Sequence, residues 1–95
     1  MASSNSVGAT YTEGAVSTSA ATLLAAKGNR KFLLIQNTGT VDVYLAFGQT
    51  ATADANSFRL LADGVGTMIM DVTVESDYIS AITASGSSTL KIGEA

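Results

Sequence analysis

The sequence predicts an all-β fold, either a small antiparallel β-sandwich or a jelly-roll-like barrel, with about six to eight short strands. Three observations favour this class. Short apolar or alternating segments recur along the chain, with turn residues between them about every 8–12 positions. No segment of about ten residues carries apolar side chains at helical spacing. Thr, Val and Ile, which favour strands, are frequent in the expected strand segments.

The start of the chain is small and polar, with Val7, Tyr11 and Val16 as isolated apolar positions. It shows neither helical nor strand periodicity, so it is either a disordered tail or an extended arm that orders on a neighbouring chain. A short strand that starts at Val16 fits within the arm. We therefore divide the chain into an extended N-terminal arm, residues 1–20, and a β-sandwich domain, residues 21–95.

The first strands of the sandwich follow the arm. Residues 21–26 fit a strand or a helical turn, and the strongly β-forming segment after them favours the strand. Residues 31–37 contain four consecutive apolar residues, which predicts a strand buried on both faces. A tight turn follows at residues 37–40, where Asn37 can cap the turn with its side chain and Gly39 can adopt a positive φ.

Residues 41–47 show the clearest alternation, with apolar side chains at the odd positions, and predict a half-buried strand paired in a hairpin. A loop without large apolar residues follows at residues 49–57. Asp63-Gly64 is a favourable turn dipeptide between two of the later strands. These later strands are expected at residues 58–61, 67–74, 78–83 and 89–93.

The composition excludes several kinds of chemistry. The chain of 95 residues contains no Cys, His, Trp or Pro. Thiolate nucleophiles, imidazole bases, Cys/His zinc sites and a disulfide framework are therefore excluded. Glu75 and Asp77 form an acidic pair, but they flank a turn without the ligand spacing of a calcium loop. We expect no enzyme activity, no catalytic residues, no cofactor and no bound metal.

The low charge points to a surface that packs against other protein. Charged residues make up 14% of the chain, against about 25% in typical domains, and the net charge is −3. Ser, Thr and Ala can be covered by protein at a small desolvation cost. With five basic residues and no apolar run of about 18 residues, we expect neither a nucleic-acid nor a membrane partner. Residues 1–6 lack the basic and apolar regions of a secretory signal.

Six side chains are candidate partner contacts: Val7, Tyr11, Val16, Arg30, Lys31 and Tyr44. The first three are the apolar points of the arm. Arg30 and Lys31 belong to a dense basic cluster that is either a charged turn or a salt-bridge site for a neighbouring subunit. Tyr44 lies on the outward face of its strand, where it suits an interface anchor or cross-strand packing. Arg59 is expected in an exposed or interfacial ion pair.

The segment AATLLAAKGNRKFLLIQNTGTVDVYLAFGQTATADANSFRLLADG resembles small virion proteins of tailed bacteriophages. The shared pattern is an Asn-Arg-Lys turn, LLIQN, a glycine turn into VYLAFG, an Ala/Thr-rich loop, a short F-x-L strand and a closing ISAITASGSSTLKI. It covers about residues 20–95 and carries no catalytic motif. The resemblance implies a small β-sandwich that acts as a capsid decoration, or cement, protein.

The resemblance further implies a place on the outer capsid surface of the virion. It implies the major capsid protein as partner, with each copy clamping neighbouring capsid subunits, and a homo-oligomer with a trimer favoured. A tail or fibre-associated structural protein is the nearest alternative. A carbohydrate- or receptor-binding β-module on the virion surface is a different class, suggested by the long loop with Asp54 and Asn56. The poverty of aromatic residues counts against that class.

Overall fold

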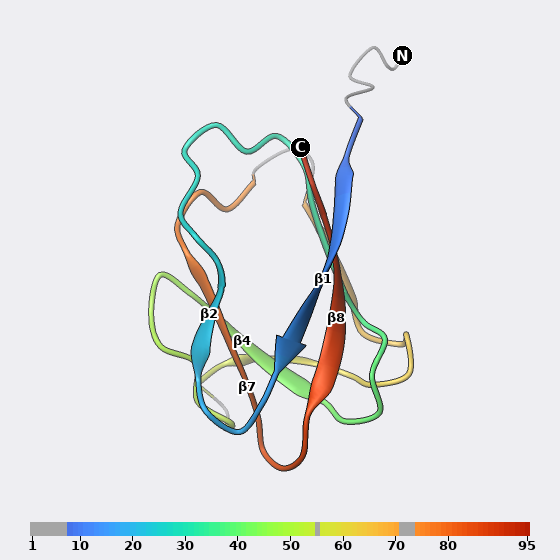
Figure 1. Ribbon diagram of the computed structural model, residues 1–95. Helices are drawn as coiled ribbons and strands as arrows, with labels where there is room; N and C mark the ends of the chain where they lie inside the picture. Colours follow the sequence, from blue (N-terminus) through green and yellow to red (C-terminus); the bar gives the residue numbers. More distant parts are fainter. Residues whose placement is uncertain (1–7, 55, 71–73) are drawn as a thin grey trace.

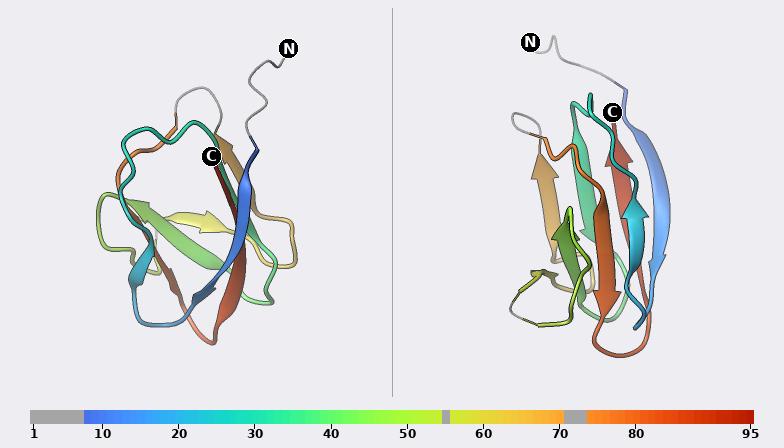
Figure 2. Two further views of the ribbon diagram at one scale, coloured as in Figure 1. Left: turned by 45° about the horizontal axis from the view of Figure 1, so that its top comes forward. Right: turned by 90° about the vertical axis from the view of Figure 1, so that its left-hand side faces the viewer.

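A computed structural model of the chain describes residues 8–54, 56–70 and 74–95, which form eight short strands. The strands make two four-stranded antiparallel sheets that pack as a sandwich (Figures 1 and 2). The predicted all-β sandwich is therefore confirmed. No helix among these residues is long and apolar enough to cross a membrane. The strands are β1 (Thr10–Val16), β2 (Ala21–Leu24), β3 (Leu33–Asn37), β4 (Val43–Phe47), β5 (Phe58–Leu60), β6 (Thr67–Met70), β7 (Ile79–Thr83) and β8 (Ser88–Glu94).

The two sheets divide the strands in an order that differs from the chain order. One sheet, called the β1 sheet below, has the order β1-β8-β3-β6, and the other, the β2 sheet, has the order β2-β7-β4-β5. The right-hand view of Figure 2 shows the β2 sheet in front of the β1 sheet. Strands β1 and β8 come from opposite ends of the chain but lie side by side (Figure 1), paired from Thr10↔Glu94 to Val16↔Ser88.

The N-terminal segment differs from its prediction. Thr10–Val16 is an edge strand of the sandwich, whereas the sequence assigned these residues to an arm outside it. Within β1, Val16 alone is buried, and the positions before it are exposed or half-buried. An edge strand with a single core residue has no apolar alternation, which is why no strand period was visible there.

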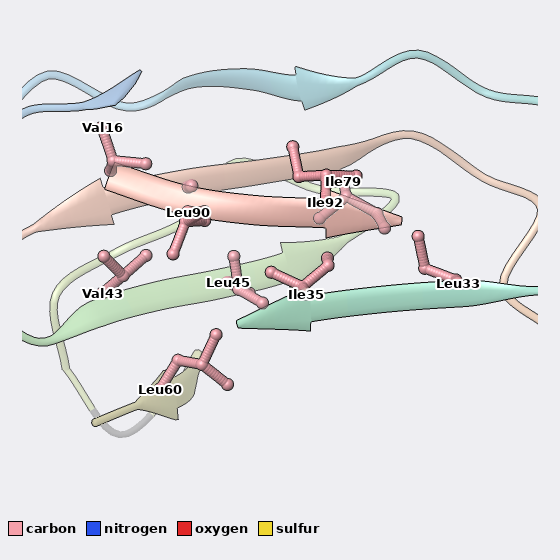
Figure 3. Packing of buried hydrophobic residues seen from close by; sticks show 10 residues of the cluster. Val16, Leu33, Ile35, Val43, Leu45, Leu60, Ile79, Leu90 and Ile92 are labelled. Atoms are coloured by element: carbon pink, nitrogen blue, oxygen red, sulfur yellow. The ribbon is translucent and has the colours of Figure 1, made fainter. Parts of the chain in front are cut away.

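The core lies between the sheets and is built from alternate positions of the strands (Figure 3). On β4, Val43 and Leu45 are fully buried, as the alternation at odd positions predicted. Burial of each large aliphatic side chain contributes about 1.5–3 kcal/mol, so this cluster supplies most of the driving force for folding. The buried cluster contains Val16, Leu33, Ile35, Val43, Leu45, Leu60, Ile79, Ala81, Leu90 and Ile92.

Strand β3 is not buried on both faces, contrary to the prediction from its apolar run. Leu33 and Ile35 are fully buried, but Leu34 between them is half-buried on the other side of the strand. Phe32, which precedes β3, is half-buried as well. The continuous run of apolar residues therefore combines a core face with an apolar outer face.

Two turns require glycine for different physical reasons, one for its backbone conformation and the other for close packing. Asp63 and Gly64 have φ values of 63° and 79°, and the Val65 N–H donates to the Ala62 carbonyl at 3.2 Å. This is the two-residue turn that Asp-Gly favours, as predicted. Gly39, in contrast, does not have the positive φ that we expected. A Cβ at Gly39 would lie 1.9 Å from Ser88 Oγ, so close packing against β8 requires the glycine.

Candidate interaction surface

Outward side chains of the β1 sheet form rows across its four strands. The register aligns Tyr11 with Gly93, Gly93 with Leu34, and Leu34 with Ile69, so these positions make one row from β1 to β6. A Cβ at Gly93 would lie 2.7 Å from Tyr11 Cε1 and 3.5 Å from Leu34 Cβ. The Tyr11 ring therefore lies in the space that glycine leaves open, beside Leu34.

This row is the centre of an exposed apolar surface. Tyr11 is 60% exposed and Ile69 is 58% exposed, while Leu34 is half-buried. Phe32 belongs to the same face by strand alternation, because it lies two residues before Leu34 and exchanges both backbone hydrogen bonds with Ala95, at 3.0 and 3.1 Å. We call Tyr11, Phe32, Leu34 and Ile69 the outer patch.

A polar row borders the outer patch. The register aligns Glu13 with Lys91, Lys91 with Gln36, and Gln36 with Thr67. Glu13 and Lys91 are therefore cross-strand neighbours of opposite charge, although no ion pair joins them. The outer face of the β1 sheet thus carries the outer patch beside a polar row with one acid and one base.

Tyr44 lies on the outer face of the β2 sheet, on the opposite side of the sandwich. It points outward between buried Val43 and Leu45, as predicted, and is half-buried. The Arg59 guanidinium carbon lies 5.9 Å from the centre of the Tyr44 ring. Arg59 Nε donates to Asp42 Oδ2 at 2.9 Å, which is the ion pair expected for Arg59. Tyr11 and Tyr44 are therefore not brought into one site.

The Asp42–Arg59 pair changes the acidity of the carboxyl group. Hydrogen bonds from the Arg59 guanidinium, and then from the Ala62 N–H at 2.8 Å, hold the pKa of Asp42 below its ordinary value of 3.8. The same pairing raises the pKa of Arg59. In the 49–57 loop, the Asn56 N–H and the Thr52 hydroxyl lower the pKa of Asp54 in the same way.

We predict that Asp42 titrates with a midpoint below 3.8 in the folded chain, measured by carboxyl carbon NMR. Because the folded pKa is below the unfolded one, the pair stabilises the fold above about pH 4, and this contribution is lost as the pH falls through the folded midpoint. Arg59→Gln should raise the Asp42 midpoint and leave that of Asp54 unchanged, since Asp54 has separate donors. An unchanged Asp42 midpoint in Arg59→Gln would contradict the assignment.

Arg30 is buried, contrary to the exposure expected for a partner contact. Its side chain is 0% exposed, and its Nε donates to Glu94 Oε2 at 2.7 Å. The two terminal nitrogens donate to the carbonyls of Ala25, at 2.9 Å, and of Glu75. Arg30 therefore joins three segments of the fold and lies out of reach of a partner. Its neighbour Lys31 is exposed.

The candidate contacts of the N-terminal segment have different outcomes. Val16 is 4% exposed and belongs to the core, so it is not the accessible contact that we expected. Val7 lies outside the described residues. Tyr11 is exposed and is part of the outer patch. The structure therefore leaves Tyr11, Lys31 and Tyr44 at the surface among the described candidates.

The 49–57 loop, which suggested a receptor site, uses its polar groups internally. Asp54 Oδ1 accepts from Thr52 Oγ1 at 2.7 Å and from the Asn56 N–H at 2.9 Å. The Ser57 hydroxyl accepts from the Thr52 N–H at 2.9 Å. These bonds shape the loop, so a structural role accounts for the presence of Asp54.

The acidic pair at the 75–77 turn is also used locally. Glu75 Oε2 accepts from the Asp77 N–H at 3.0 Å, and Asp77 Oδ1 accepts from the Tyr78 N–H at 2.8 Å. No group of three or more His, Cys, Asp or Glu side chains that could hold a metal ion occurs in the described part of the chain. Both carboxylates therefore cap backbone groups of their own turn.

Two exposed apolar features were not identified from the sequence. Ile69 is one of them. It lies between Met68 and Met70, which face the core, so strand alternation in the sequence would have indicated that Ile69 faces outward. The other is a set of three exposed side chains that are close in sequence, with Phe58 at the start of β5 and Leu61 and Val65 around the Asp63-Gly64 turn, and we call this set the apolar tip. All three side chains of the tip are exposed, and Val65 is 70% exposed. An apolar residue beside a turn dipeptide is the signal that would have found it.

A shallow groove of about 390 Å³ lies between β1 and β2, which are edge strands of the two sheets. Most of its lining residues are small, including Gly14, Ala15, Ser17 and Ala21. Such side chains leave strand edges accessible to an added strand. The groove therefore runs along the two neighbouring sheet edges formed by β1 and β2.

Comparison of the chain with models of protein families, with curated proteins and with solved structures found no match.

Proposed function

We propose that the protein is a non-enzymatic structural protein of a bacteriophage particle, which decorates the assembled capsid and stabilises it by binding across neighbouring capsid subunits. The apolar tip carries this proposal. Phe58, Leu61 and Val65 place three large apolar side chains at the surface within one short stretch of a chain that is poor in charge. Apolar surface of this kind is stabilised when a protein partner covers it. The resemblance to small virion proteins supports the choice of partner.

The backbone of the apolar tip is held in place, which suits binding to a repeated surface. The Asp63 N–H donates to the Gly39 carbonyl at 2.8 Å, and the Gly64 N–H donates to the Asn37 carbonyl at 2.7 Å. The Gly66 N–H donates to the Leu61 carbonyl at 2.9 Å. Because the tip is ordered before it binds, association costs less conformational entropy.

The stabilisation would arise from mass action. A protein that binds the assembled shell and not its separate subunits adds its binding free energy to the assembled state. Many copies on one shell add many such contributions, so moderate affinity per copy suffices. Contacts with the capsid through Val7, Tyr11, Lys31 and Tyr44 stay predictions, and we expect them to contribute less to binding than the apolar tip.

We predict that the purified protein binds capsids of its source phage assembled without it and raises the temperature at which those shells rupture. Leu61→Ser/Val65→Ser should weaken binding at least about tenfold, since it removes two exposed apolar contacts. Co-sedimentation measures binding, and electron microscopy locates the protein on the particle.

The matched control is Ile69→Ser, which removes a similarly exposed side chain from the outer patch and should retain capsid binding through the tip. No binding to capsids, or density confined to the tail, would overturn the decoration function. Specific glycan binding without capsid binding would instead favour the receptor-binding class.

A further inference from the structure

We propose that Asp63 makes a charge contact within the apolar tip, in which its carboxylate binds a basic side chain of the capsid subunit that covers Leu61 and Val65. This inference rests on the proposed function and adds the chemistry of the partner, which is an apolar surface with an arginine or lysine beside it. Asp63 lies between the two apolar residues in the chain, and all three side chains are exposed. The tip therefore presents one negative charge together with its apolar side chains.

A closed turn holds these three residues near one another. The Gly66 N–H donates to the Leu61 carbonyl at 2.9 Å, which brings the two ends of the segment together. Leu61, Asp63 and Val65 are therefore exposed on one short turn. The Asp63 N–H donates to the Gly39 carbonyl at 2.8 Å, so the backbone that carries the carboxylate is fixed to the neighbouring turn. A charged group on an ordered backbone loses little conformational entropy when it binds.

The carboxylate of Asp63 has no hydrogen-bond or ion-pair partner among the described residues. The other described acids, apart from Glu13, accept hydrogen bonds within the chain; these acids are Asp42, Asp54, Glu75, Asp77 and Glu94. Those five carboxylates serve the fold itself. The carboxylate of Asp63 is thus available to a partner.

The turn does not require an acid at this position. Asp63 has a φ of 63°, a conformation in which Asn is favoured as well as Asp. Asn-Gly is also as typical as Asp-Gly of two-residue turns with positive φ. An uncharged Asn would therefore satisfy the backbone, and the negative charge of Asp63 goes beyond what the turn needs.

Charge complementarity identifies the partner group as a base. When a protein covers Leu61 and Val65, it also removes water from the carboxylate between them. A carboxylate without water or a partner is costly to bury, and a guanidinium or ammonium group that donates to it offsets this cost. An acid or an apolar group opposite Asp63 would instead weaken the contact. A basic site also attracts a chain whose net charge is −3.

The test is co-sedimentation with capsids of the source phage assembled without this protein, at salt concentrations of about 50 and about 300 mM. Asp63→Asn keeps the turn and removes the charge, so it should weaken binding about five- to tenfold at low salt and reduce the salt dependence of the affinity. Glu13→Gln is the matched control. It also removes the charge of an acid without a partner among the described residues, but on β1, and should leave the affinity and its salt dependence unchanged. Thermal unfolding of each variant confirms that it is folded.

The outcomes separate this inference from the proposed function. If the unaltered chain does not bind capsids, the decoration function and the inference both fail. If it binds and Asp63→Asn binds equally well, only the inference fails. It also fails if Glu13→Gln weakens binding as much as Asp63→Asn, because total charge then accounts for the effect. Self-association of the unaltered chain that is lost in Asp63→Asn would place the base on a second copy and overturn the assignment to the capsid.

Discussion

Replacement of Arg30 by methionine is expected to lower the free energy of unfolding by about 3 kcal/mol, because the change removes a buried charge from all of its partners at once. Methionine keeps an unbranched apolar side chain in the same space. The half-buried carboxylate of Glu94 then loses its ion-pair partner, and the carbonyls of Ala25 and Glu75 lose their donors. Urea unfolding at constant m value measures the effect.

Glu94→Gln is the control for the ion pair alone. Its amide oxygen can still accept from Arg30 Nε, so a loss of about 1 kcal/mol is expected. The double variant Arg30→Met/Glu94→Gln separates the ion pair from the hydrogen bonds to the carbonyls of Ala25 and Glu75. Most of the stability lost in Arg30→Met should also be lost in the double variant, because the two carbonyls still lack their donors. A loss below 1 kcal/mol in Arg30→Met would show that the buried guanidinium does not hold these segments together.

Arg30 also shows why its role was not visible in the sequence. The Asn-Arg-Lys cluster looked like a charged turn, and turns are usually at the surface. Its burial arises because Ala25, Glu75 and Glu94, distant from one another along the chain, converge on one guanidinium. Local patterns carry no information on such a convergence, so the exposure of Lys31 was predictable and the burial of Arg30 was not.

The elements that were predicted correctly depend on local chemistry. Odd positions of residues 41–47 are apolar, and β4 buries Val43 and Leu45. The Asp63-Gly64 turn follows from the low cost of a positive φ in these residues. The burial prediction failed for β3, because one face of this strand lies in the core and the other face is at the outer surface of the sheet. Leu34 is apolar on an outward position because the outer patch is there, and this made β3 look buried on both faces.

The candidate site was predictable only in part. Tyr11 was chosen as an isolated apolar residue, but its neighbours in the outer patch come from β3, β6 and the residue before β3. The sheet order that brings β1 and β8 together, and β8 beside β3, is a long-range property. Without that order, no pattern in the sequence places Tyr11 in the same row as Ile69.

Asn37 offers the second large effect on stability. It is fully buried, and its side chain connects β3 to three other parts of the fold. Its Nδ2 donates to the carbonyls of Val41, at 2.8 Å, and Leu60, at 3.0 Å. Its Oδ1 accepts from the Gly39 N–H at 3.1 Å, which is the turn cap that the sequence predicted, and from Ser88 Oγ at 2.8 Å.

Asn37→Ala is therefore expected to lower the free energy of unfolding by about 3 kcal/mol, since it leaves buried donors and acceptors without partners. Ser88→Ala is the matched control, because it removes only one of the four hydrogen bonds and should cost about 1 kcal/mol. Both values come from urea unfolding. If the two variants lose equal stability, the network does not act as a unit and Asn37 serves only as a turn cap. A loss in Asn37→Ala that clearly exceeds the loss in Ser88→Ala identifies Asn37 as the residue that connects the β3–β4 turn to β5 and β8. Because the Gly64 N–H also donates to the Asn37 carbonyl, the same residue helps to position the Asp63-Gly64 turn of the apolar tip.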